Sequence, residues 1–210
     1  MNSIDIFDPC PNCGSTLLDE KFMGEFASIG KRKNTNYFEI LECSMCKTLI
    51  TSHWKISTKG EYSRISRIPP KVHKLVVDQL FKNHYQQFIE IYNESATAEA
   101  YKLKNVCGPG YRKALEFLIK DYSINKYPDN IGDIKKSALS TCIKKYITDV
   151  QLKETAERAA WIGNDEVHYI KIWENKDIND LKEFIQSVVI YITNELKYNK
   201  MKEEMPNKIF

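Results

Sequence analysis

The chain has 210 residues, of which 42% are hydrophobic and 28% charged, and its formal net charge is +3. This composition is typical of a soluble protein, and the mild positive charge permits a nucleic-acid partner without requiring one. The most apolar stretch, residues 184–192, is far shorter than the roughly 20 residues that span a bilayer. Residues 1–11 lack the basic and apolar segments of a signal peptide. We therefore expect a cytoplasmic protein with no membrane partner.

The first third of the chain is expected to be β-rich. Short segments in which apolar and polar residues alternate, separated by glycines, are typical of strands and turns. Such segments lie at residues 21–29, 37–41, 48–57 and 61–68. Pro69 and Pro70 then favour the start of a helix. We accordingly place a first domain at residues 1–68.

Two Cys-x-x-Cys pairs occur in this domain, Cys10 with Cys13 and Cys43 with Cys46. Each pair can present two thiolates to one ion from a tight turn, and two pairs complete a tetrahedral site. Four thiolates leave no open position for water, so we predict a structural Zn²⁺ that contributes folding energy. An iron–sulfur centre or a redox pair is the alternative.

The same domain is rich in basic residues. Residues 21–70 contain nine Lys or Arg and four Glu, with aromatic residues among them. Phosphate contacts and base stacking would use such a surface, and the candidates for nucleic-acid binding are Lys31, Arg32, Lys33 and Trp54. The alternative is a solvated small domain whose aromatic residues form its core.

From residue 71 onward, apolar residues recur every three to four positions, which indicates helices. The predicted helices lie at residues 77–92, 96–103, 111–122, 139–163 and 177–197. Gly108-Pro109-Gly110 is expected to break the helical pattern, and Gly163 to end a helix. We place a helical bundle at residues 69–198 and a flexible tail at 199–210.

The last predicted helix carries an apolar stripe with alternating three- and four-residue steps: Ile178, Leu181, Ile185, Val188 and Ile192. This stripe is either a face of the chain's own bundle or a short coiled-coil seam that joins a homodimer.

Four polar residues of the helical region form a candidate site. Arg112 and Glu116 lie one helical turn apart, and Asn164 and His168 follow Gly163. The alternative is structural: an intrahelical Arg112–Glu116 ion pair, Asn164 as a helix N-cap, and His168 bonded to Glu116.

The segments GYRKALEFLIK (110–120) and ERAAWIGNDEVH (157–168), which follow two cysteine knuckles, resemble the bacterial domain of unknown function 4145. That family is similar to HEPN helical domains and occurs alone or beside restriction-type nucleases. The resemblance covers about residues 70–195. It implies an α+β protein, with a small N-terminal β-rich zinc ribbon followed by an all-α HEPN-like bundle, in phage defence or nucleic-acid processing.

Three functions follow from these features. The first is a non-catalytic module that binds RNA, DNA or a protein. The second is a HEPN-like, metal-independent endoribonuclease with His168 as acid or base, Asn164 as donor and Arg112 as phosphate clamp. HEPN enzymes carry an Arg four to six residues before the His, whereas the nearest here is Arg158, so Arg112 would have to replace it. The third is a homodimeric scaffold.

Overall fold

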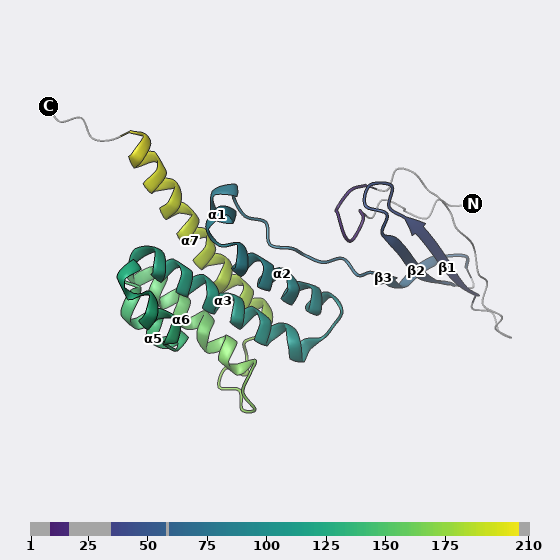
Figure 1. The fold of residues 1–210 in the computed structure, drawn as a ribbon. Helices are drawn as coiled ribbons and strands as arrows, with labels where there is room; N and C mark the ends of the chain where they lie inside the picture. Colours follow the sequence, from purple (N-terminus) through teal and green to yellow (C-terminus); the bar gives the residue numbers. More distant parts are fainter. Residues whose placement is uncertain (1–8, 17–34, 58, 206–210) are drawn as a thin grey trace. The chain divides into compact units, whose positions relative to one another are not determined.

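The computed structural model describes residues 9–16, 35–57 and 59–205 of the chain. It divides into two compact units, Met1–Val72 and His73–Phe210. The first unit carries an antiparallel sheet and the second is helical, so the chain is α+β (Figure 1). The strand predicted at residues 21–29 and the basic residues Lys31, Arg32 and Lys33 lie outside the described residues.

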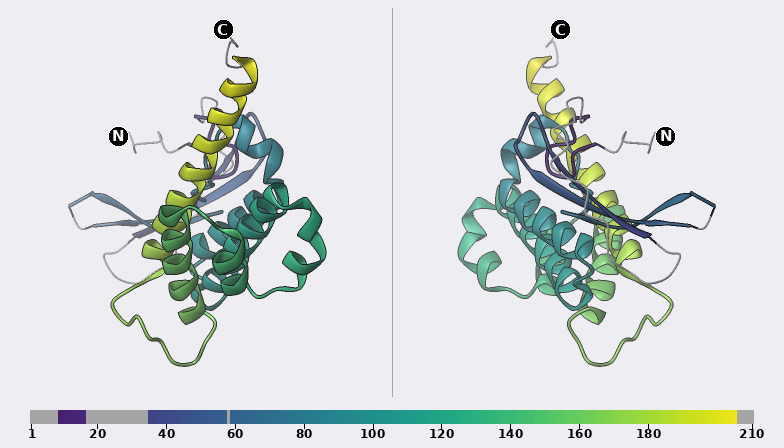
Figure 2. Two further views of the ribbon diagram at one scale, coloured as in Figure 1. Left: turned by 90° about the vertical axis from the view of Figure 1, so that its left-hand side faces the viewer. Right: turned by 90° about the vertical axis from the view of Figure 1, so that its right-hand side faces the viewer.

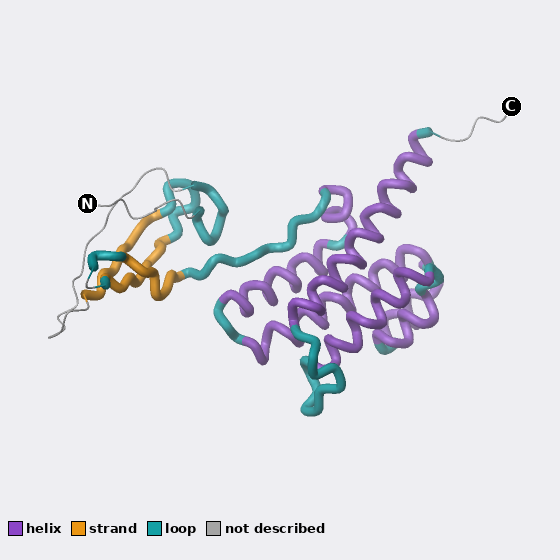
Figure 3. The backbone as a smooth tube through the Cα atoms, turned by 180° about the vertical axis from the view of Figure 1, so that it is seen from behind, coloured by secondary structure: helices purple, strands orange, loops and turns teal. Residues whose placement is uncertain are grey.

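The sheet has three strands in the order β1-β2-β3, drawn in orange in Figure 3. They are β1 Thr35–Glu42, β2 Leu49–Ile56 and β3 Tyr62–Ile68. These strands confirm three of the predicted segments. In β2 the side chains alternate, so that Ile50, Ser52 and Trp54 lie on one buried face. This period of two is that of a half-buried strand.

Among the described residues of this unit, one buried apolar cluster includes two of the cysteines. Leu41 of β1 pairs with Ile50 of β2, and both pack with Cys10 and Cys43 in one buried cluster. The cysteines are therefore part of the core of the unit.

The second unit consists of helices, shown in purple in Figure 3. They are α1 Gln79–His84, α2 Gln86–Ala100, α3 Lys104–Lys126, α4 Ile131–Lys136, α5 Leu139–Tyr146, α6 Val150–Asp165 and α7 Ile178–Glu204, with a 3₁₀ turn at Pro128–Asn130. Aspartates begin several of them: Asp78 caps α1, Asp149 caps α6 and Asp177 forms a capping box with Asp180 on α7. Their carboxylates accept backbone N–H groups that the helix leaves unpaired.

Helix α3 is the centre of the bundle and packs against α2, α5, α6 and α7. Its buried side chains include Tyr111, Leu115 and Leu118. The ring of Tyr92 on α2 meets that of Tyr111 edge to face, with centroids 4.9 Å apart. The hydroxyl of Tyr111 donates to Glu99 at 2.6 Å, so the polar end of a buried aromatic residue also links α2 to α3.

The predicted break at Gly108-Pro109-Gly110 is wrong, because α3 begins at Lys104 and runs through all three residues. The glycines serve close packing instead. A Cβ atom on Gly110 would lie 2.3 Å from Ser95 Oγ, and one on Gly108 would lie 2.6 Å from Glu166 Oε2. Gly108 and Gly110 thus lie inside a helix and allow neighbouring segments to approach that helix closely.

The C-terminal helix α7 also differs from the prediction, because it continues to Glu204 and residues 199–204 are helical. Lys197 pairs with Asp78 at 2.9 Å and Lys200 with Glu204 at 3.7 Å, which supports the added turns. Leu181, Ile185, Val188 and Ile192 are buried within the chain's own bundle. These four residues of the stripe therefore form a face of the chain's own bundle.

None of the described helices combines the length and apolar character that a membrane span requires.

Candidate metal centre and polar cluster

Four cysteines of the first unit form one cluster. The Sγ atoms of Cys10, Cys13, Cys43 and Cys46 all lie within 4.8 Å of one another. Cys10 and Cys46 are 3.6 Å apart, as are Cys13 and Cys43. A tetrahedral site with metal–sulfur bonds of about 2.3 Å has sulfurs about 3.8 Å apart. The four thiols are thus positioned to bind one metal ion.

The two cysteine turns have the same backbone geometry. The residue after each Cys-x-x-Cys pair, Gly14 or Lys47, donates its N–H to the carbonyl of Cys10 or Cys43, in both cases at 2.9 Å. Both residues have positive φ, 74° at Gly14 and 58° at Lys47. This conformation costs a residue with a side chain roughly 1–2 kcal/mol. Lys47 has this conformation despite its cost, which indicates that the turn is required to position Cys43 and Cys46.

Two hydroxyl groups that the sequence analysis did not consider lie against the sulfurs. Ser15 Oγ is 3.0 Å from Cys13 Sγ and 3.3 Å from Cys43 Sγ, and Thr48 Oγ1 is 3.1 Å from Cys46 Sγ. Each hydroxyl residue stands two positions after the second cysteine of its pair. This shared position after each cysteine pair is the sequence signal that identifies the two hydroxyl residues. Such partners orient metal ligands and tune their basicity.

These surroundings affect the thiol groups differently. The hydroxyl of Ser15 and the backbone N–H of Cys46 lower the pKa of Cys43 to about 6. Thr48 lowers the pKa of Cys46, while burial raises the pKa of Cys10 to about 11. A metal ion binds thiolates, so binding would release the protons that remain. Part of the ligand set is already stabilised as the anion.

Trp54 does not present an open ring for base stacking, contrary to the expectation. Its side chain is only 9% exposed. Its indole N–H donates to Glu39 Oε2 at 3.4 Å, and the guanidinium of Arg64 lies 5.3 Å from the ring centroid. The sequence pattern identified an aromatic residue among cations, but the cation covers the ring. Trp54 belongs to the packing of the sheet.

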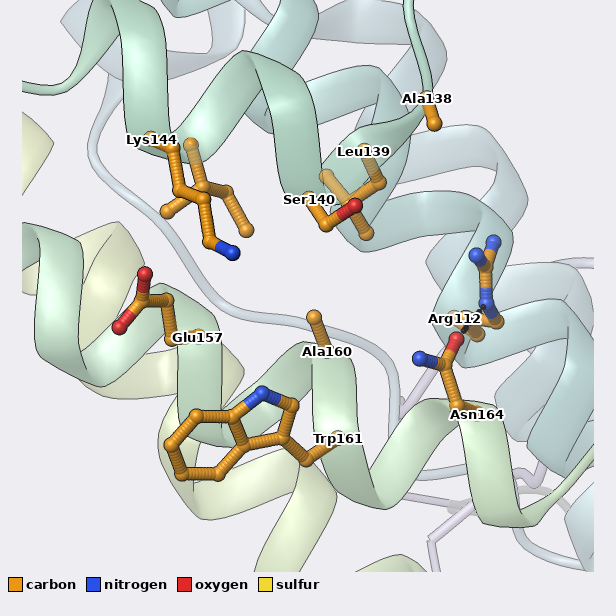
Figure 4. Close-up of a pocket in the computed structure, with 10 residues that line it drawn as sticks. Arg112, Ala138, Leu139, Ser140, Lys144, Glu157, Ala160, Trp161 and Asn164 are labelled. Atoms are coloured by element: carbon orange, nitrogen blue, oxygen red, sulfur yellow. Dashed lines mark hydrogen bonds between the residues drawn. The ribbon is translucent and has the colours of Figure 1, made fainter.

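In the helical unit, the structure brings three of the four candidate residues together. Arg112 donates from Nε to Asn164 Oδ1 at 2.9 Å (Figure 4). Its Nη1 donates to Glu116 Oε2 at 3.2 Å. Lys120 adds a second ion pair to Glu116 at 2.7 Å. Burial raises the pKa of Glu116, but Lys120 and Arg112 together hold it below its usual value. The Glu116 carboxylate is therefore an anion, and its ion pair holds Arg112 in place.

Asn164 and Gly163 are both within α6, so Gly163 does not end that helix and Asn164 is not an N-cap. A Cβ atom on Gly163 would lie 2.9 Å from Arg112 Cγ. The glycine is needed for close contact between α6 and α3. This contact places the Asn164 amide within reach of Arg112, across 52 positions in sequence.

His168 is not part of this cluster. It is exposed and lies in the segment between α6 and α7, which projects from the helices in both views of Figure 2. Its backbone N–H donates to the Asn164 carbonyl at 3.0 Å. Within the residues that the structure describes, no hydrogen bond joins its imidazole to Arg112, Glu116 or Asn164.

Asp165 determines the path of this segment and was missed by the sequence analysis. Its side chain, 5% exposed, accepts the backbone N–H groups of Ile172 at 3.0 Å and Trp173 at 2.6 Å. The chain thus folds back after α6 instead of starting a new helix near residue 165. No local spacing marks an aspartate that binds backbone groups seven and eight residues later.

A cavity of about 250 Å³ opens beside the Arg112–Asn164 pair, between α3, α5 and α6 (Figure 4). Its polar lining consists of Arg112, Ser140, Lys144, Glu157, Trp161 and Asn164. Leu139, Ile143 and Ala160 supply apolar surface. The sequence analysis named two of these polar residues, because the others come from helices whose relative placement no local pattern specifies.

Comparisons of the chain with protein-family models, with curated proteins and with solved structures find no match. The resemblance to the domain of unknown function 4145 thus stays a prediction.

Proposed function

We propose that the first unit is a structural zinc module, and that the four-sulfur cluster is the observation that carries this function. Two turns of matched geometry bring Cys10, Cys13, Cys43 and Cys46 together. A set of four thiolates is typical of closed, structural Zn²⁺ sites, which have no position for a reacting water. The metal would hold the turns against the sheet and supply folding energy.

Metal content tests this proposal. The purified chain should contain about one zinc ion per molecule, measured by mass spectrometry of the metal, and Cys43→Ser should lose most of it. Cys107→Ala is the matched control, because Cys107 is a buried cysteine of the helical unit outside the cluster. Bound iron with the visible absorption of a cluster would contradict the zinc assignment.

The module further serves to bind nucleic acid through the phosphate backbone. Three cations of this unit are exposed: Lys55 on β2, Lys59 in the turn that follows β2, and Arg64 on β3. Glu61, between Lys59 and Arg64, carries the opposing charge. Lys31, Arg32 and Lys33 add positive charge to the same unit. Trp54 is covered, which favours contacts to phosphates over base stacking. A protein partner is the alternative occupant.

Salt-dependent binding tests this second part. Fluorescence anisotropy with labelled RNA and DNA should give an affinity that falls as salt rises, because phosphate contacts release counterions. The double variant Lys55→Ala/Lys59→Ala should weaken binding and reduce the salt slope by about two. Lys136→Ala, an exposed lysine of the helical unit, is the control. Absence of binding by the wild type at low salt would favour a protein partner.

The other two functions have less support. Ribonuclease chemistry needs a base beside the phosphate cation, and among the described residues no hydrogen bond joins the His168 imidazole to the side chain of Arg112 or Asn164. The apolar stripe predicted to join a homodimer is buried in the chain's own bundle at Leu181, Ile185, Val188 and Ile192. The defence context is supported by the resemblance alone.

A further inference from the structure

The cavity between α3, α5 and α6 is lined by donors that have no protein acceptor. Within the described part of the chain, none of five groups makes a hydrogen bond. They are Arg112 Nη2, Ser140 Oγ, Lys144 Nζ, Trp161 Nε1 and Asn164 Nδ2. In Figure 4 the polar ends of Ser140, Lys144 and Asn164 point toward the space between the helices. A cavity with this lining favours a ligand rich in acceptors, that is, an anion.

Two of these donors are held in position before any ligand arrives. Asn164 Oδ1 accepts from Arg112 Nε at 2.9 Å, so the amide presents its NH₂ group to the cavity. Glu116 fixes the guanidinium from its other side at 3.2 Å. Binding therefore has to freeze few side-chain rotamers at this end, which lowers the entropic cost of binding.

The start of α5 adds to the positive potential. Ala138, the N-cap of α5, has no side chain that can accept the backbone N–H groups of the first turn. Leu139 and Ser140 of that turn line the cavity. The N-terminal end of a helix has a partial positive charge, which supports the charges of Arg112 and Lys144.

The opposite side of the cavity has a different character. Trp161 is 44% exposed, and its ring stacks on that of Trp173 with centroids 6.0 Å apart and planes 7° apart. This pairing fixes a flat apolar surface. Glu157 is the carboxylate among the described lining residues and can accept a hydroxyl or amino group. The cavity thus combines an anion-binding end, a flat wall and one acceptor.

We propose that this cavity binds a small organic phosphate. The phosphoryl group lies between Arg112 and Lys144, within reach of the Asn164 amide and the Ser140 hydroxyl. The organic body rests against Trp161 and directs a hydroxyl or amino group to Glu157. A volume of about 250 Å³ is near the lower end of small-molecule sites and suits a ligand of mononucleotide size or smaller. This proposal is independent of the zinc module.

Calorimetric titration of the full chain with adenosine 5′-monophosphate tests whether the cavity binds an organic phosphate. Separate titrations with inorganic phosphate and with adenosine measure the contributions of the two halves of that probe. The whole probe should bind more tightly than either half. Lys144→Ala should weaken binding of the nucleotide and of phosphate about tenfold, the loss expected for one charged hydrogen bond, and leave adenosine unchanged. Trp161→Leu should weaken the nucleotide and adenosine but leave phosphate unchanged.

The controls separate binding from folding. Lys144 is exposed, so its substitution should leave the circular dichroism spectrum unchanged, unlike a change at the packed Arg112. Lys136→Ala, outside the cavity, should bind as the wild type does. The proposal is overturned if neither nucleotide nor phosphate binds the wild type at millimolar concentration, or if both variants bind normally. A 5′-phosphorylated RNA oligonucleotide that binds more tightly than the mononucleotide and is weakened by Lys144→Ala would also overturn it, because the occupant of the cavity would then be a polymer. RNA binding by the first unit alone should not respond to Lys144→Ala.

Discussion

Gly163 has no side chain, and the side chain of Arg112 packs where a methyl group at position 163 would lie. A Cβ atom at position 163 would lie 2.9 Å from Arg112 Cγ and 3.1 Å from Arg112 Cβ. Because Asn164 follows on the same helix, the contact that the glycine permits also sets the hydrogen bond between Asn164 and Arg112. One missing side chain thus determines both the packing of α3 on α6 and the shape of the polar cluster.

Gly163→Ala should therefore destabilise the helical unit. Alanine improves helix propensity by about 1 kcal/mol, but overpacking a tight contact costs typically 1–3 kcal/mol. Urea unfolding followed at 222 nm measures the net loss. Gly132→Ala is the matched control, since a Cβ atom there has nothing within 4 Å and should stabilise the protein slightly. Equal effects of the two substitutions would contradict the packing role.

Asp165→Ala should loosen the segment between α6 and α7. The substitution leaves the N–H groups of Ile172 and Trp173 without their acceptor, a loss of about 1–3 kcal/mol for each unpaired group that stays buried. Hydrogen exchange should become faster in residues 166–176 and stay unchanged in α3. Glu174→Ala, an exposed carboxylate of the same segment, should have no such effect. Unchanged exchange in Asp165→Ala would show that other contacts hold the segment.

Removal of the metal should affect the two units differently. A strong chelator should unfold the sheet around Cys10 and Cys43, because the buried cluster there includes the ligands themselves. The helical unit has its own core around Leu115 and Leu118 and should keep its ellipticity at 222 nm. Two-dimensional NMR measures this as a loss of dispersed sheet signals. Loss of the helical signals as well would mean that the units depend on each other for folding.

The helical unit should lose stability in acid. The N–H of Leu152 and further hydrogen bonds hold the pKa of Asp149 below its ordinary value, and Lys145 and Tyr146 do the same for Asp133. Groups whose pKa is lower in the folded state stabilise it above their unfolded pKa, near 4, and lose this effect as the pH falls. The urea midpoint should thus be constant from pH 7 to 5 and fall below about pH 4.

Asp149→Asn tests the assignment of this acid sensitivity. Asparagine still accepts the N–H of Leu152 as a helix cap but does not titrate. The variant should therefore have a smaller difference between its urea midpoints at pH 7 and pH 3 than the wild type. Glu174→Gln, at an exposed position, is the control and should retain the full difference. An undiminished pH dependence in Asp149→Asn would assign the effect to other carboxylates.

The four-cysteine cluster, the described strands and the helical character of the second unit were predictable from the sequence alone. The helix bounds were not: the single helix predicted at residues 139–163 is α5 and α6, and the separate helix predicted at 96–103 is the end of α2 and a turn. Cys-x-x-Cys spacing, two-residue alternation and three- to four-residue apolar repeats are local patterns, and each directly determines a local geometry. The stripe of Ile185 and Val188 on α7 was recognised for the same reason. Its partner was not, because periodicity identifies a buried face without identifying what covers it.

The tertiary structure alone decided the roles of Gly108, Gly110 and Gly163, the separation of His168 from Arg112, and the capture of Ile172 and Trp173 by Asp165. The local sequence does not show whether a glycine forms a turn or lies at a contact between helices. Only the position of the neighbouring helix distinguishes these two roles. The polar cavity likewise collects side chains from three helices. Its donors meet because α3, α5 and α6 pack at particular distances, which no short sequence window specifies.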